Sequence, residues 1–143
     1  VRLLQAAHLE HAQEGKRTMT LVRRGDRRIL NLEEIESLGG RLGFAALQVV
    51  WEDFRLHQQI EIMHKTDVLV GIYGAGLIKI VFARPLSVLL ELLPYCLHNA
   101  SDFWEISSSL WIRHYVWRNE FRNASRRSHA DASCGQLDCG DNP

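Results

Sequence analysis

DVLVGIYGAGL, residues 67–77, is an apolar run of strand length that ends in a glycine-rich turn. The near-continuous apolar residues over 67–72 indicate a strand that is buried on both faces of a sheet. Gly71, Gly74 and Gly76 permit a tight turn from strand to helix and a close approach of backbone N–H groups to an anion. A turn without a ligand is the alternative, since neither a complete dinucleotide fingerprint nor a Walker A loop is present.

Similar apolar runs lie on both sides of this stretch and alternate with helical segments. Strands that alternate with helices at this spacing predict a parallel α/β sheet, that is, a Rossmann-like domain. Asn31 is expected to cap the first helix, which carries acidic residues in its first turn. The further strands are expected at 18–23, 46–51, 87–92 and 112–117, and the helices at 32–38, at 56–64 and in a short segment after Gly76.

The composition fits one globular domain and argues against some classes of function. The chain has 143 residues, of which 46% are hydrophobic, and this suffices for a packed core. Seventeen Lys and Arg balance seventeen Asp and Glu, so the basic excess of a dedicated nucleic-acid binder is missing. No apolar run approaches the ~20 residues that span a bilayer, so membrane attachment is expected only through a segment outside this sequence.

The two ends of the chain differ in character from its middle. Residues 1–17 are expected to be the end of a preceding helix, residues 18–120 the folded domain, and residues 121–143 a disordered or non-native tail. The chain begins on Val1 without a signal-peptide pattern, so a targeting segment is expected upstream.

Two asparagines and three cysteines bear on the cellular compartment. Asn99 and Asn123 stand in Asn-x-Ser triplets, which are compatible with N-glycosylation in a luminal protein. Cys96, Cys134 and Cys139 are too few for a disulfide framework. The spacing of Cys134 and Cys139 allows a local disulfide bridge and is also a weak signal for a metal site. No His or second Cys pair completes the four ligands of such a site. We therefore expect no metal site.

Charged residues follow two of the predicted strands. Arg23, Arg24, Arg27 and Arg28 come directly after the first strand, where open α/β sheets bind ligands. Guanidinium groups suit phosphate oxygens, so a diphosphate is a natural ligand, whereas a solvated turn is the alternative. Glu91 is a lone carboxylate at the end of an apolar strand and can accept hydrogen bonds from ribose hydroxyls. A strand-end charge in solvent is the alternative for Glu91.

Several motifs follow one another in a recurrent order. They read VRRGDRRILNLEEI, HQQIEIMHKTDVLVGIYGAGL, VFARP, VLLELLPY and HYVWRN, and they span about residues 18–119. In this order and at this spacing the chain resembles glycosyltransferase family 61. The resemblance implies a two-lobed, inverting GT-B-type enzyme that takes a UDP-sugar. The chain would be its C-terminal, donor-binding lobe.

The resemblance also implies roles for individual charged residues. Arg23 and Arg28 are matched to the arginines that hold the donor diphosphate. Asn31 and Glu33 would shape the loop behind these arginines, and Glu91 would face the ribose.

The glycine-rich turn is matched to the part of the family pattern that lies near the phosphates. Gly74, Ala75 and Gly76 would offer backbone N–H donors there. Tyr73 precedes them at the position where the family has His, so this chain departs from the pattern at one residue of the implied site.

As a function, the resemblance implies transfer of N-acetylglucosamine, or alternatively xylose, from a UDP-sugar to a protein or glycan hydroxyl. The expected compartment is the lumen of the endoplasmic reticulum or the Golgi, and no cofactor is expected. Inverting transfer needs a general base. The resemblance places that base in the other lobe, so the catalytic residue is unknown and this chain alone is expected to be inactive. The alternative is a non-catalytic fragment or pseudoenzyme that keeps the fold as a binding module.

Overall fold

Five parallel strands form a single sheet in the order β2-β1-β3-β4-β5. The computed structural model of the chain describes residues 15–25, 28–95, 97 and 102–120. The five-stranded parallel sheet confirms the predicted Rossmann-like α/β class. The strands are β1 (Arg17–Val22), β2 (Phe44–Val49), β3 (Val68–Ile72), β4 (Val88–Leu93) and β5 (Arg113–Arg118).

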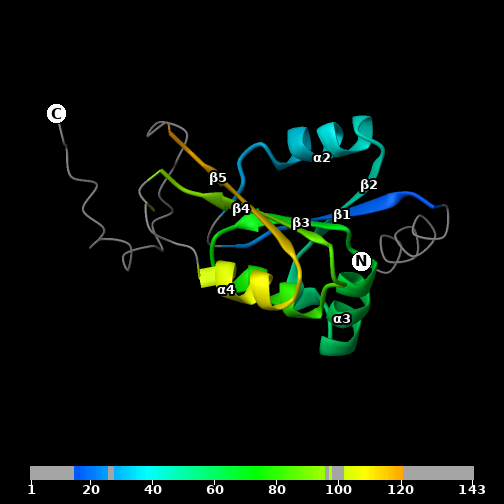
Figure 1. Cartoon of the computed structure of the whole chain (residues 1–143). Coiled ribbons are helices and arrows are strands. Elements are labelled where there is room, and N and C mark those ends of the chain that lie inside the picture. The colour runs from blue at the N-terminus through cyan, green and yellow to red at the C-terminus, as the bar shows by residue number, and fades with distance from the viewer. Residues whose placement is uncertain (1–14, 26–27, 96, 98–101, 121–143) are drawn as a thin grey trace.

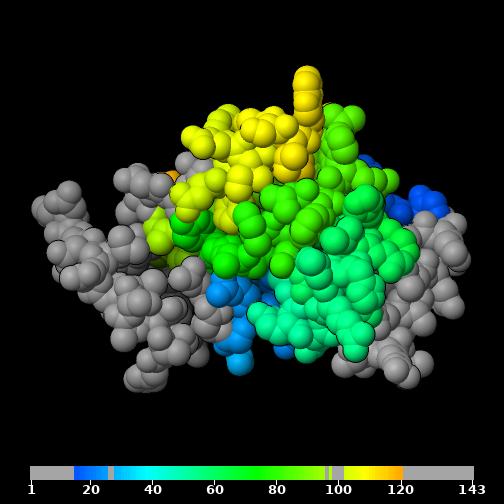
Figure 2. Space-filling view, turned by 90° about the horizontal axis from the view of Figure 1, so that it is seen from below, coloured from blue at the N-terminus to red at the C-terminus, as the bar shows by residue number. Residues whose placement is uncertain are grey.

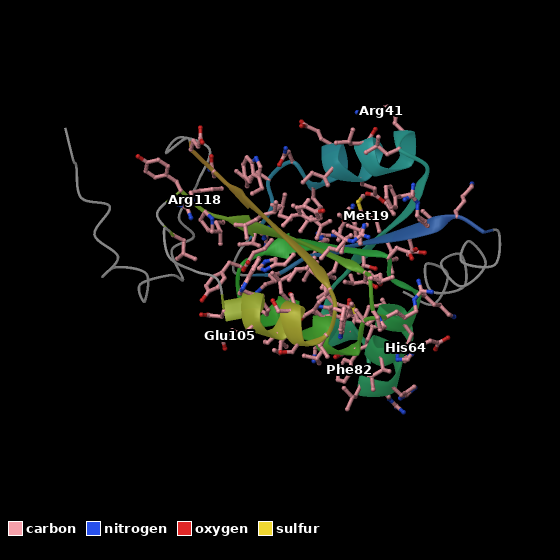
Figure 3. All side chains as sticks on the ribbon, in the orientation of Figure 1. Met19, Arg41, His64, Phe82, Glu105 and Arg118 are labelled. Carbon is pink, nitrogen blue, oxygen red and sulfur yellow. The ribbon has the colours of Figure 1, made fainter. Side chains whose placement is uncertain are left out.

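Helices cover the sheet on both faces (Figure 1). The helix α2 (Leu32–Arg41) lies on one face, where Leu32 packs with Met19, Leu21 and Val70. Figure 3 shows the Met19 side chain between the sheet and α2. The other face is covered by α3 (Leu56–Lys65), α4 (Asp102–Ser109) and the 3-10 helix η3 (Ala75–Phe82). Figure 2 shows these elements across the lower face.

The larger hydrophobic core lies beneath this second face. Its buried members come from four of the strands, from the residue that precedes β5 and from all the helices there. They are Val22, Val49, Trp51, Met63, Leu69, Leu77, Ile80, Leu89, Phe103 and Ile112. Because both faces of the central strands are packed, β1 and β3 consist almost entirely of apolar residues and threonine.

Two predicted features are corrected by the structure. The second strand ends at Val49, so Trp51 lies beyond the strand in a short 3-10 helix, η2 (Trp51–Asp53). Asn31 does occupy the N-cap of α2, but its side chain makes no capping hydrogen bond. Its amide instead donates to Glu34 Oε2 at 3.4 Å, and the backbone at φ −109°, ψ 37° is not the extended conformation usual for a capping residue.

Some predictions fall on residues outside the described part of the chain. These are the helix and the tail expected at the two ends, whose domain boundaries stay predictions, and five single residues: Asn99, Asn123, Cys96, Cys134 and Cys139. Among the described residues, no helix has the length and apolar character needed to cross a membrane.

Gly71 in β3 lies where the sheet and η3 approach each other most closely. A Cβ at this position would lie 2.8 Å from Leu77 Cδ2 and 3.1 Å from Val22 Cβ, which belongs to a buried strand. We expect Gly71→Ala to lower the free energy of unfolding by about 1–3 kcal/mol, as overpacking does elsewhere.

Gly40→Ala in α2 is the matched control, since a Cβ added at Gly40 would meet nothing within 4 Å. Alanine is the better helix former, so this variant should gain up to about 1 kcal/mol. Denaturant unfolding of both variants checks the contrast. Equal stability of the two alanine variants would contradict the packing described for Gly71.

Candidate functional site

The chain leaves β1 and β3 in opposite directions across the sheet. After β1 it passes through α2 to the edge strand β2, whereas after β3 it passes through η3 to β4. Neighbouring parallel strands with this divergence form a crevice beyond their carboxyl ends, which is where open α/β sheets bind ligands. A cavity of about 380 Å³ lies here, within the usual size range of ligand sites. We call it the cationic cavity; it is lined by Arg23, Arg24, Trp51, Glu52, Gln59, Ala75, Gly76, Ile78 and Lys79.

Two arginines directly after β1 supply much of its positive charge. The backbone N–H of Arg23 donates to Val49 O at 2.7 Å, which continues the pairing of β1 with β2 and fixes the position of this residue. The Arg23 side chain is exposed, and within the described residues its guanidinium has no hydrogen-bond or ion-pair partner. With Arg24 and Lys79 it outweighs the single acid, Glu52, so the cavity favours an anion.

The glycine-rich turn forms the opposite wall. Gly74 has φ 138° and ψ −177°, a conformation that is essentially restricted to glycine. The first hydrogen bond of η3 runs from Leu77 N to Gly74 O at 3.0 Å. The N–H groups of Ala75 and Gly76 therefore precede the intrahelical ladder, as the first N–H groups of a helix do. Such groups are ready donors for an anion.

Gly76 also lets this wall approach β1. A Cβ at Gly76 would lie 3.2 Å from Val22 Cγ1 and 3.4 Å from Arg24 Cδ, so the turn and the arginine are in direct contact. Trp51 fixes the position of the turn, since its Nε1 donates to Gly76 O at 2.8 Å. Gln59 in α3 holds Trp51 in turn, through a hydrogen bond from Nε2 to Trp51 O at 2.9 Å. The cavity wall is thus braced by η2 and α3.

A second cavity of about 360 Å³ adjoins the first. We call it the aromatic cavity; it is lined by Tyr73, Gly74, Ala75, Ile78, Asp102, Phe103 and Ile106. The Tyr73 hydroxyl donates to Asp102 Oδ2, and the rings of Tyr73 and Phe103 meet edge to face with centroids 6.3 Å apart. Ala75 and Ile78 line both cavities, so the two lie next to each other along the start of η3, and we call the pair of cavities the groove.

Glu91 lies inside β4 and not at its end. Its side chain is 0% exposed, and Oε2 lies 2.8 Å from Nε2 of His114 on the neighbouring strand β5. Burial raises the pKa of the Glu91 carboxyl, although the hydrogen bond and charge of His114 act in the opposite direction. The charge of Asp102 adds to the rise in this pKa. The alternative of a strand-end charge in solvent is therefore wrong for Glu91.

The sequence profile of the family described as Glycosyltransferase 61 matches residues 2–90, which is well over half of the chain. The chain belongs to glycosyltransferase family 61.

Individual members of this family are similar at low identity. An EGF domain-specific O-linked N-acetylglucosamine transferase of Gallus gallus is 25% identical over 114 residues, which cover 76% of this chain and 21% of that protein. Its namesake in Xenopus laevis is 28% identical over 74% of this chain and 21% of its own length. An alpha-1,3-arabinosyltransferase of Oryza sativa subsp. japonica is 30% identical over 60% of this chain and 15% of its own length. The chain spans about a fifth of the length of the curated relatives it matches.

The structure brings together only some of the residues that the resemblance to family 61 points to. Arg23, Ala75 and Gly76 line the cationic cavity, and Tyr73, Gly74 and Ala75 line the aromatic one. The other predicted residues lie elsewhere: Arg28, whose Nε donates to Gly25 O at 3.3 Å, Asn31 at the start of α2, and the buried Glu91. The binding roles of all these residues stay predictions.

Several residues that line or support the two cavities give little signal in the sequence. Trp51 is missed because the predicted second strand runs to Trp51 and places it inside the sheet. Gln59 is missed with it, because its contact is with Trp51. Asp102 is missed because α4, with three consecutive serines, gives a weak helical pattern. Phe103 is one of the aromatic residues that the sequence offers for stacking a base or a sugar, with a place in the core as the alternative. The paired arginines of VRRGDRR are the one available signal for Arg24. Among the described residues, no group of three or more His, Cys, Asp or Glu could hold a metal ion.

Proposed function

We propose that this chain is the donor-binding part of a family 61 glycosyltransferase and that the cationic cavity binds the diphosphate of a UDP-sugar. One observation carries the proposal: Arg23, whose side chain is exposed, and the helix-start residues Ala75 and Gly76 line one cavity at the topological switch point. Guanidinium groups and helix-start N–H groups are the two donor types that proteins use most readily for phosphate oxygens.

This arrangement also suits the chemistry of sugar transfer. As the bond from the sugar to UDP breaks, negative charge grows on the departing diphosphate. Fixed positive side chains and aligned N–H donors stabilise that charge more in the transition state than in the bound donor. We propose that Arg23, Arg24 and Lys79 provide this stabilisation without a cofactor. The general base that takes the proton of the acceptor hydroxyl would belong to another part of the enzyme.

The sugar, acceptor and compartment are proposed from the relatives. Relatives named as N-acetylglucosamine transferases favour N-acetylglucosamine as the sugar, and the pentose transferase of Oryza sativa keeps xylose as the alternative. The acceptor would be a hydroxyl of a protein or glycan. We propose an inverting GT-B-type reaction in the lumen of the endoplasmic reticulum or the Golgi. Because the chain spans about a fifth of its relatives, it is expected to be inactive by itself.

Calorimetric titration of the chain with UDP, uridine and inorganic pyrophosphate tests the proposal. We expect saturable binding of UDP, weaker binding of pyrophosphate and no measurable binding of uridine, because the diphosphate contributes most of the electrostatic attraction. Binding of uridine as tight as that of UDP would contradict a diphosphate site. Circular dichroism and cooperative unfolding of the same sample show that the chain titrated is folded.

A non-catalytic binding module is the second candidate, and one observation favours it. Tyr73 replaces the His of the family pattern, and its hydroxyl is already engaged by Asp102. The side-chain hydroxyl next to the glycine-rich turn is therefore bonded within the protein and not left for a phosphate. A folded chain that binds neither UDP nor pyrophosphate would favour this second candidate and refute the first.

A further inference from the structure

We propose that the aromatic cavity is the nucleoside subsite of the groove and that Asp102 accepts the hydrogen bonds of the ribose hydroxyls. Tyr73 would hold the Asp102 carboxylate in place for this contact. The inference rests on the proposed function, because it assigns the part of the nucleotide that remains once the diphosphate occupies the cationic cavity.

The closeness of the two cavities is the first argument. Ala75 and Ile78 line both of them, so the nucleoside of a ligand whose diphosphate occupies the cationic cavity has the aromatic cavity as its neighbouring compartment. The charges divide in the same way as they do in a nucleoside diphosphate. The cationic compartment carries arginines and a lysine, whereas the aromatic one is walled by apolar side chains and contains a single carboxylate.

The surroundings of Asp102 are the second argument. Asp102 is exposed at the start of α4, and the Tyr73 hydroxyl donates to its Oδ2. A carboxylate has about four acceptor sites, so this bond leaves capacity for both hydroxyls of a ribose. It also restricts rotation of the carboxylate, which lowers the entropy cost of ligand binding. Tyr73 and Phe103, whose rings meet edge to face, give the same compartment an aromatic lining of the kind that suits the apolar faces of a nucleoside.

The burial of Glu91 is the third argument. Its side chain is 0% exposed and bonded to His114, which is itself buried in β5. A ribose could reach Glu91 only if β5 or α4 moved away. Asp102 needs no such movement, because it already lines a cavity. Of the two carboxylates, Asp102 is therefore the better placed to bind a ribose.

Titration with UDP and 2′-deoxyuridine diphosphate, each against the wild-type chain and its variants, tests the proposal. The wild type should bind UDP about tenfold more tightly than the deoxy compound, since one hydrogen bond to a charged acceptor is lost. Asp102→Ala should bring this ratio close to one and leave the affinity for inorganic pyrophosphate unchanged. Tyr73→Phe should reduce the ratio in part, because the carboxylate keeps its charge but loses its restraint.

Glu105→Ala is the matched control: it removes an exposed carboxylate from the same helix, at a position outside the cavity (Figure 3). It should keep the full ratio. A ratio that persists in Asp102→Ala would overturn the proposal. So would a ratio that is lost in Glu91→Gln but kept in Asp102→Ala, which would assign the ribose to Glu91.

The remaining outcomes separate this inference from the proposed function. Wild-type binding of pyrophosphate, UDP and the deoxy compound without preference for the ribose would overturn the nucleoside subsite and leave the diphosphate site standing. No binding of any of the three probes to the folded chain would refute the diphosphate site, and the nucleoside subsite with it.

Discussion

Arg23→Ala is expected to lower the affinity of the chain for UDP about tenfold to a hundredfold. The Arg23 guanidinium is exposed at the mouth of the cationic cavity, and within the described residues no side chain neutralises it. Hydrogen bonds to charged groups contribute about 1.5–3 kcal/mol, which corresponds to this range of affinities. Because the side chain carries no packing role in the core, the variant should unfold at the same denaturant concentration as the wild type.

Two further arginines make this experiment specific. Arg41→Ala removes an equal charge from the end of α2, away from the cavity, where the side chain bonds Ser37 (Figure 3). It should leave the affinity for UDP within about twofold, the size of effect expected for a distant screened charge. Arg28→Ala tests the family resemblance against the cavity geometry. The resemblance assigns Arg28 to binding of the diphosphate, but Arg28 does not line the cavity. If Arg23→Ala binds UDP as the wild type does, the proposed diphosphate site is wrong.

His114→Leu is expected to lower the free energy of unfolding by about 3 kcal/mol, because it breaks a buried pair. The side chains of His114 and Glu91 are 2% and 0% exposed, and they bond each other through Nε2 and Oε2. Removal of one partner leaves a buried carboxyl without this hydrogen bond, which costs far more than the net value of the bond. Urea unfolding of the variant measures the loss.

The double variant Glu91→Met, His114→Leu is the control for this explanation. A buried polar pair replaced by apolar side chains of similar volume is often nearly neutral, so most of the stability should return. A double variant that is less stable than His114→Leu would contradict the explanation. Loss of packing around β5 would then be the cause.

The pH dependence of unfolding gives a second check on the same pair. Burial raises the pKa of Glu91, so the folded chain keeps a proton that the unfolded chain has released above ~pH 4.3. The stability that Glu91 contributes is therefore full below ~pH 4.3 and is lost as the pH rises through the pKa of the folded state. Relative to Glu91→Gln, the wild type should lose unfolding free energy over that interval. A gain would mean that the carboxyl pKa is lowered.

The fold could be predicted from the sequence because its signals are local. The apolar runs of β1, β3 and β4 have no competing helical period, and the glycine-rich turn after β3 marks where the strand must end. The predicted end of β2 lies two residues too late, since Val50 and Trp51 continue its apolar pattern past the true end at Val49. The helix α4 has no such pattern, because aromatic residues and serines dominate it.

The site was less predictable, because its parts are set by contacts between distant segments. Arg23 and Gly76 could be connected through the strand-end rule alone. The position of Glu91 could not, because its burial depends on the register of β4 against β5, which sets His114 beside it on the same face. The contact between Tyr73 and Asp102 joins residues 29 positions apart and required α4 to be known.

The pairing of β1 with β3 has a further consequence for the stability of the chain. These strands meet through Met19, Thr20 and Leu21 opposite Val68, Leu69 and Val70, although α2, β2 and α3 separate them along the chain. The cationic cavity exists only while this seam is closed, so a ligand bound in the cavity would hold it closed. At a hundred times its dissociation constant a ligand adds about 2.7 kcal/mol against opening. If UDP binds in the cavity as proposed, hydrogen exchange along the seam should slow in proportion, so ligand occupancy and the lifetime of the strand pairing would report a single equilibrium.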